Sequence, residues 1–135
     1  MQWTALTIFF GLNFDVQDIN SCKYREFAQS QMNYVLGKDT RSFVVGYGNN
    51  PPTKPHHRAS SCPKRPRPCG LEEKASSGPN PQLLIGAVVG GPDINDRFYD
   101  DRNNYKQSEV ALDFNAGYQG RISLRGQIHS KHEFL

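Results

Sequence analysis

Hydrophobic residues recur at helical intervals near the start of the chain. In KYREFAQSQMNYVLG, residues 23–37, apolar side chains are three and four positions apart, which predicts an amphipathic helix. Gly37 stands where a helix often ends with a residue in the left-handed conformation. We therefore expect this helix to end at Gly37. The side chains at this spacing are Tyr24, Phe27, Ala28, Gln31 and Val35.

A second stretch, SEVALDFNAGYQG, has the same period and predicts a helix over 108–120. Ser108 is a residue type preferred at the N-cap, and Gly120 is a residue type that ends helices. This placement puts Glu109 in the first turn. The face of the predicted helix carries Val110, Phe114, Gly117 and Tyr118.

Between these helices the pattern is irregular. Residues 41–63 begin as a short extended run and then break up into glycine, asparagine and proline, which indicates a long loop. Residues 69–82 form another loop. The apolar run 83–93, LLIGAVVGGPD, is interpreted as a buried segment whose glycines let the backbone approach other segments, because it lacks the GK[ST] ending of a phosphate-binding loop.

The two ends of the chain differ from the middle. MQWTALTIFFGLNF holds an apolar run about half as long as a bilayer span requires, so no membrane span is expected. As a secretory signal it is weak, because no Lys or Arg precedes the run and no small-residue cleavage site follows it. A buried helix whose upstream part is missing is the favoured interpretation. Residues 121–135 are expected to form a C-terminal tail.

Composition limits the possibilities further. A chain of 135 residues suits one modest domain, and 12 Gly, 9 Pro and a mean hydropathy of -0.67 predict a loop-rich fold with a thin core. The net charge of +3 is small and scattered, so a nucleic-acid partner is not indicated. The dense basic run PKRPRP, residues 63–68, is either a polyproline-type recognition segment or, the interpretation we favour, a solvated loop.

The chain has three cysteines, an odd number, so at most one disulfide forms within it. Cys62 and Cys69 are the plausible pair because the proline-rich segment between them can close a small loop. The alternative is that these cysteines bind a metal together with His56 and His57, but no compact paired ligand motif is present. We expect no metal and no other cofactor.

The polar stretch FYDDRNNYKQSEVALDFNA, residues 98–116, carries two carboxylates of chemical interest. Asp100 and Glu109 are nine positions apart with Tyr105 between them. Two carboxylates on either side of a glycosidic bond are what glycoside hydrolysis needs. The alternative is that these carboxylates are solvated or cap helices, with Asp101 and Arg102 forming an ion pair. Spacing alone does not decide between the two.

Two longer stretches carry a family resemblance. SFVVGYGNNPPTKPHHR, residues 42–58, and the segment GPNPQLLIGAVVGGPDINDRFYDDRNNYKQSEVALDFNAG resemble the C-terminal part of a glycoside hydrolase family 9 catalytic domain. CPKRPRPC followed by PNPQ is most similar to the animal endoglucanases of that family. The first stretch matches at Gly48, Asn50, Pro55, His56 and Arg58, and the second at Phe98, Asp100, Tyr105, Glu109, Asn115 and Ala116.

The resemblance implies a mainly α fold: the C-terminal portion of an (α/α)6 barrel with long irregular loops, formed by residues 1–120 as a truncated catalytic domain. It implies a secreted protein that acts on β-1,4-glucan. By resemblance, Glu109 is the general acid, Asp100 the supporting carboxylate, and His56 a catalytic residue that also binds sugar. Arg58 and Tyr105 are implied to bind the substrate.

The sequence departs from the family in two respects. Ala59 stands where the family usually has glycine, and the Asp-Ala-Gly-Asp stretch that carries the family's catalytic base does not occur in these residues. Three functions therefore stay open: a cellulase-type endoglucanase using an inverting mechanism, a non-catalytic carbohydrate-binding remnant, and a truncated product without activity.

Overall fold

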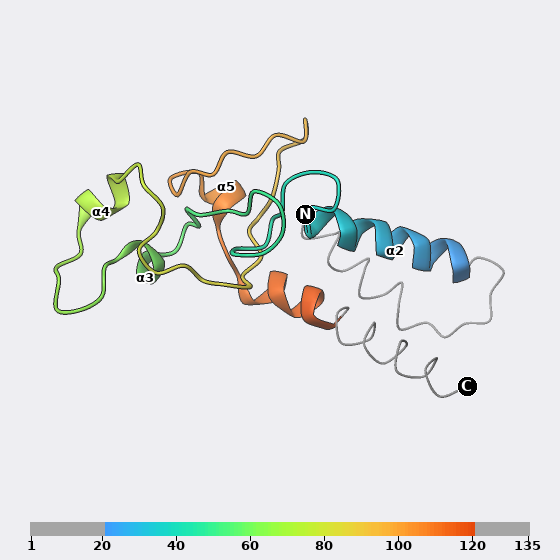
Figure 1. Cartoon of the computed structure of the whole chain (residues 1–135), viewed down its shortest axis with the longest axis horizontal. Helices are drawn as coiled ribbons and strands as arrows, with labels where there is room; N and C mark the ends of the chain where they lie inside the picture. The colour runs from blue at the N-terminus through green and yellow to red at the C-terminus, as the bar shows by residue number, and fades with distance from the viewer. Residues whose placement is uncertain (1–20, 121–135) are drawn as a thin grey trace. The chain divides into compact units, whose positions relative to one another are not determined.

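The structure is a computed structural model that describes residues 21–120. Its helices are α2 (Ser21–Val35), α3 (Arg58–Ser61), α4 (Leu71–Ala75) and α5 (Tyr105–Ser108), and residues 112–120 are also helical (Figure 1). The chain divides into two compact units. One combines residues 1–33 with 112–135, and the other consists of residues 34–111 and holds every predicted site residue.

Helix α2 follows the predicted spacing with a different buried face. Ala28 and Met32, four residues apart, are buried, whereas Phe27 is 48% exposed. The predicted end is confirmed: Gly37 has φ +75° and its N–H donates to the carbonyl of Tyr34. A Cβ at Gly37 would lie 2.4 Å from the backbone nitrogen of Ser42, so both the conformation and the space require glycine.

The core of the 34–111 unit is small. Phe43, Val45 and Val89 are buried together, and burial of each such side chain contributes roughly 1.5–3 kcal/mol. The structure therefore agrees with the thin core that composition predicts. The half-buried hydrophobic residues around it are Tyr34, Val35, Ala87, Phe98 and Val110.

Isolated β-bridges join segments that are far apart in the sequence. Val44 pairs with Val88 and Val89 pairs with Val110, both antiparallel, so the predicted extended run after residue 41 lies beside the 83–93 segment. A third bridge, parallel, joins His56 to Glu109. Through these bridges the core directly fixes the backbone of both resemblance stretches.

Gly90 allows the closest of these approaches. Its N–H donates to the carbonyl of Glu109, 2.9 Å away. A Cβ at Gly90 would lie 2.6 Å from the carbonyl oxygen of Lys106, which is backbone and has little freedom to shift. The prediction that glycine in this apolar run permits close backbone approach is confirmed. The burial prediction holds only in part, because Leu83 is 40% and Ile85 is 70% exposed.

The predicted helix over 108–120 is wrong at its start. Ser108 ends α5, Glu109 is extended with φ -63° and ψ 141°, and the helical conformation resumes at residue 112. The bridges of Glu109 and Val110 need an extended backbone, which a helix cannot supply. The Ser108 hydroxyl is buried and donates to the carbonyls of Asp101 and Asn104, so it does not act as an N-cap.

Some predictions lie outside the described residues. These are the apolar N-terminal run, with its weak signal peptide, and the tail over 121–135. Within residues 21–120, no helix has the length and apolar character needed to cross a bilayer. The assignment of residues 1–120 to one catalytic domain stays a prediction.

Candidate active site

The histidine loop, residues 50–58, is the first component of the site. Pro52 and Pro55 are buried, which anchors the loop on both sides of Thr53 and Lys54. The backbone N–H of His56 donates to the carbonyl of Ser108 at 2.8 Å, so His56 lies beside the segment that carries Glu109. His57 caps α3, its ring nitrogen accepting from the Ser60 N–H, and it also lines the depression that His56 borders.

The ring of His56 is oriented by a backbone carbonyl. Its Nδ1 lies within hydrogen-bond distance of the carbonyl oxygen of Arg102. A carbonyl only accepts hydrogen bonds, so Nδ1 carries a proton in this contact, which leaves Nε2 for other partners. The ring of Tyr105 lies 6.2 Å from the His56 ring, between centroids, in a tilted arrangement.

Asp100 holds the histidine loop. Its Oδ2 accepts from the backbone N–H and the hydroxyl of Thr53, both at 2.8 Å, and its Oδ1 accepts from the N–H of Lys54 at 3.0 Å. Hydrogen bonds to a charged acceptor are about twice as strong as those between neutral groups. The carboxylate therefore fixes the segment immediately before His56.

Arg41 completes the surroundings of Asp100. Burial lowers the pKa of the Arg41 guanidinium, and the negative charge of Asp100 opposes that shift. The guanidinium carbon lies 4.5 Å from the centroid of the Phe98 ring, a cation–π distance, and Nη2 donates to the carbonyl of Asn50. Arg41 thus connects the start of the histidine loop to Phe98 in the second resemblance stretch.

Arg102 is a buried cation that the sequence interpretation missed. Only 3% of it is exposed, and its guanidinium donates to the side-chain oxygen of Asn80 and to the carbonyls of Glu73, Ser76 and Gly78. The considered ion pair with Asp101 is wrong: the Asp101 carboxylate accepts from Asn103 instead.

Asn80 relays this arrangement to the histidine loop. Its amide donates to the carbonyl of Pro55 at 2.9 Å and to the hydroxyl of Ser60 at 2.8 Å. Arg102 therefore supports the histidine loop in two ways, through the contact of its own carbonyl with His56 and through the hydrogen bond of Asn80 to Pro55. Sequence spacing does not reveal this, because most of the acceptors of Arg102 are backbone carbonyls.

We predict that Arg102→Lys lowers the free energy of unfolding by about 3 kcal/mol, because an ammonium cannot reach four acceptors that lie around a planar fork. Arg97→Lys is the matched control, since Arg97 is exposed. Urea denaturation of both variants measures the difference. A loss for Arg102→Lys no larger than that for Arg97→Lys would contradict the role given to this cation.

The segment before Glu109 is fixed by buried polar side chains. Gln107 is 6% exposed, and its amide donates to the carbonyl of Arg97 while its oxygen accepts from Tyr99 and Asn104. These contacts close the 97–108 loop onto α5. Glu109, two residues after Gln107, is exposed at the end of this hydrogen-bonded segment.

His56, Arg58 and Glu109 line one open depression of about 1100 Å³. The structure thus brings together three of the five residues that the resemblance assigns to catalysis or substrate binding. The other two do not line the depression. The ring of Tyr105 lies beside the ring of His56, and the Asp100 carboxylate accepts hydrogen bonds from Thr53 and Lys54 of the histidine loop. The disulfide loop forms another part of the wall, with Lys64, Arg65 and Arg67.

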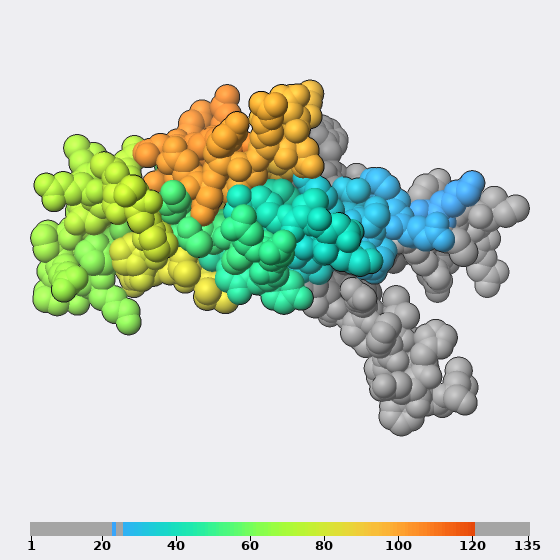
Figure 2. All heavy atoms as spheres, turned by 45° about the horizontal axis from the view of Figure 1, so that its top comes forward, coloured from blue at the N-terminus to red at the C-terminus, as the bar shows by residue number. Residues whose placement is uncertain are grey.

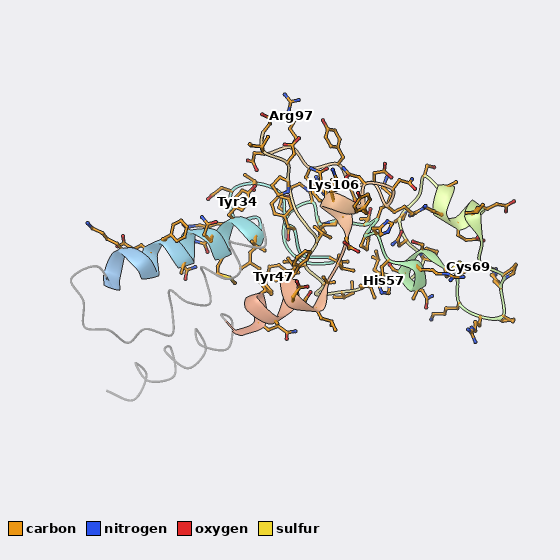
Figure 3. All side chains as sticks on the ribbon, turned by 180° about the vertical axis from the view of Figure 1, so that it is seen from behind. Tyr34, Tyr47, His57, Cys69, Arg97 and Lys106 are labelled. Carbon is orange, nitrogen blue, oxygen red and sulfur yellow. A yellow bond between two sulfur atoms is a disulfide. The ribbon has the colours of Figure 1, made fainter. Side chains whose placement is uncertain are left out.

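The disulfide loop, residues 62–69, is closed by a bond between Cys62 and Cys69, the pair that the sequence favours. Both sulfurs are thereby unavailable as zinc ligands. The polyproline alternative also fails. Seven residues of polyproline helix span about 22 Å, whereas the Cα atoms of these cysteines are 5.4 Å apart. Figure 3 labels Cys69 in this loop, with His57 on the neighbouring segment.

The sequence matches a known protein family. A family model described as Glycosyl hydrolase family 9 matches residues 2–122. The chain belongs to this family. Endoglucanase 2 of Persea americana is 45% identical over 71% of this chain and 81% of its own length. Endoglucanase 10 of Oryza sativa subsp. japonica is 43% identical over 79% of this chain, but only 18% of its own length is covered.

Solved structures of this family are similar to the chain. An endoglucanase from the termite Nasutitermes takasagoensis superposes with a TM-score of 0.83 at 45% identity, over 92% of this chain and 30% of the termite chain. CelQ of Clostridium thermocellum, solved with cellotriose, gives 0.78 at 35% identity, over 92% of this chain and 20% of CelQ. The chain thus spans about a third of the termite protein. Plant and termite relatives are equally identical to it, so these identities do not single out an animal subgroup.

Proposed function

We propose that this family 9 chain supplies the acid and sugar-binding half of an endoglucanase site, the C-terminal portion of an (α/α)6 barrel, that hydrolyses β-1,4-glucosidic bonds with inversion. The observation that supports this most directly is the shared depression of His56, Arg58 and Glu109. The cello-oligosaccharide in the related CelQ structure supports the substrate class. Secretion is proposed on the family relationship, and the disulfide agrees with it.

In this proposal Glu109 is the general acid. Its carboxyl proton moves to the glycosidic oxygen as the C–O bond breaks. A water molecule attacks the anomeric carbon from the opposite face and loses its proton to a general base that these residues do not supply. The backbone of Glu109 is held on both sides, by Gly90 and through the bridge to His56, which favours a fixed position for an exposed side chain. No cofactor is needed for these steps.

His56 and its neighbours would hold the sugar. The second ring nitrogen of His56, Nε2, hydrogen-bonds to a sugar hydroxyl, and Arg58 donates to ring or hydroxyl oxygens. Tyr105, with 55% of its surface exposed, offers an aromatic face and a hydroxyl next to His56. We assign Asp100 a positioning role: it acts through Thr53 and Lys54 on the placement of His56.

The catalytic base is the missing component. The Asp-Ala-Gly-Asp stretch does not occur in this sequence, and a base contributes roughly 10²–10⁴-fold in rate. We therefore expect the purified chain to bind cellotetraose without releasing reducing sugar from cellulose. This result would match the carbohydrate-binding alternative for the isolated chain, so a second experiment is needed.

The deciding experiment places residues 21–120 into the termite endoglucanase in place of its matching segment. We expect this chimera to hydrolyse cellotetraose and to release the α-anomer first, which NMR detects before mutarotation. A folded chimera without activity would overturn the proposal. Release of the β-anomer would overturn the inverting mechanism alone.

A further inference from the structure

The depression that holds Glu109 is strongly cationic. Lys64, Arg65 and Arg67 of the disulfide loop line it together with Arg58, and Glu109 is the one carboxylate among its described lining residues. The side chains of these four cations form no hydrogen bond or ion pair with any residue from 21 to 120. Four of the basic residues, which the sequence analysis treats as scattered, are therefore gathered in this depression.

The disulfide loop is held in place. The Cys62–Cys69 bond closes its base, and three prolines within it fix backbone angles. The amide of Gln82 donates to the carbonyls of Ala59 at 3.1 Å and Cys62 at 2.8 Å, which anchors the loop to the segment after the histidine loop. In Figure 2 this loop and α4 (lime green) gather at one end of the 34–111 unit, open to solvent.

We infer that this depression binds a β-1,4-linked glucan that carries carboxylate groups in preference to a neutral one. The inference rests on the proposed function, because the glucan backbone lies against His56 and Arg58. The carboxylates contact Lys64, Arg65 and Arg67. The guanidinium groups of the two arginines match a carboxylate in a two-bond geometry, and the Lys64 ammonium adds a positive charge. A hollow lined by cations concentrates anions, and a neutral glucan gains nothing from that field.

The test measures the affinity of the full chain by calorimetry for cellotetraose and for a carboxymethylated cellotetraose. Carboxymethyl dextran carries the same charged groups on an α-linked glucan, so it tests whether binding requires the β-1,4-linked sugar backbone. In 20 mM salt we expect the carboxymethylated tetraose to bind roughly tenfold more tightly than the neutral one, as several exposed ion pairs produce. The preference is expected to fall to about twofold or less in 0.5 M salt because of screening.

Two triple variants isolate the loop. Lys64→Gln, Arg65→Gln and Arg67→Gln together are expected to remove the preference and leave the affinity for neutral cellotetraose unchanged. The control combines Lys23→Gln, Lys38→Gln and Arg97→Gln, which removes the same charge at exposed positions outside the depression. Figure 3 shows Arg97 well away from Cys69. The control is expected to keep the preference.

The outcomes separate the inference from the proposed function. Equal binding of neutral and carboxymethylated tetraose overturns the inference and leaves the glucan site intact. Failure of neutral cellotetraose to bind counts against the proposed function. If carboxymethyl dextran then binds as tightly as the carboxymethylated tetraose, the cationic cluster is a general polyanion surface, and the inference is also overturned. An equal loss of preference in the two triple variants would likewise overturn it.

Discussion

Replacing Glu109 with glutamine in the termite chimera is expected to lower the rate of cellotetraose hydrolysis roughly 10²–10⁴-fold, with a small effect on binding. Glutamine keeps the shape of the side chain and cannot release a proton. The backbone of Glu109 is fixed by Gly90 and His56, so the substitution at an exposed side chain leaves the site assembled. Initial rates and a binding isotherm measure the two effects separately.

The leaving group distinguishes an acid from a residue that only binds. A 2,4-dinitrophenyl cellobioside has a leaving group that departs without a proton, so its hydrolysis should fall far less in Glu109→Gln than that of cellotetraose. Glu72→Gln is the matched control, because Glu72 is exposed on α4 away from the depression. Equal losses on both substrates would reject Glu109 as the acid.

Sequence reasoning succeeded where the determinant is local. The end of α2 depends on a positive φ that glycine adopts freely, and the disulfide depends on two cysteines separated by a short proline-rich segment. The family relationship depends on residue types in fixed order, which a sequence displays directly. It identified His56, Arg58 and Glu109, and the structure brings these three into one depression.

It failed where distant segments impose a conformation. The 108–120 stretch has a helical period, yet Glu109 and Val110 are extended because they pair with His56 and Val89. Arg102 and Asn80 occur in polar runs that suggest exposure, and both are buried because each joins loops that are far apart in the sequence. Every residue type has a backbone carbonyl, so a side chain that donates to carbonyls cannot be recognised from the residue types around it.

Asp100→Ala is expected to lower the free energy of unfolding by about 3 kcal/mol, because three donors of Thr53 and Lys54 lose a charged acceptor. Once these hydrogen bonds are lost, the segment that leads to Pro55 and His56 is no longer held in place. We therefore also expect the affinity for cellotetraose to fall by about tenfold. Urea denaturation and calorimetry of the full chain measure both quantities.

Two further variants separate charge from position. Asp101→Ala removes the adjacent exposed carboxylate, which accepts only from Asn103 among the described contacts, and should cost less than about 1 kcal/mol. Asp100→Asn retains one oxygen for Thr53 but directs an NH₂ group at the N–H of Lys54, so it should be closer to Asp100→Ala than to wild type. A stable Asp100→Ala chain with unchanged affinity would mean that the carboxylate does not position His56, and a role in the chemistry would then be the better explanation.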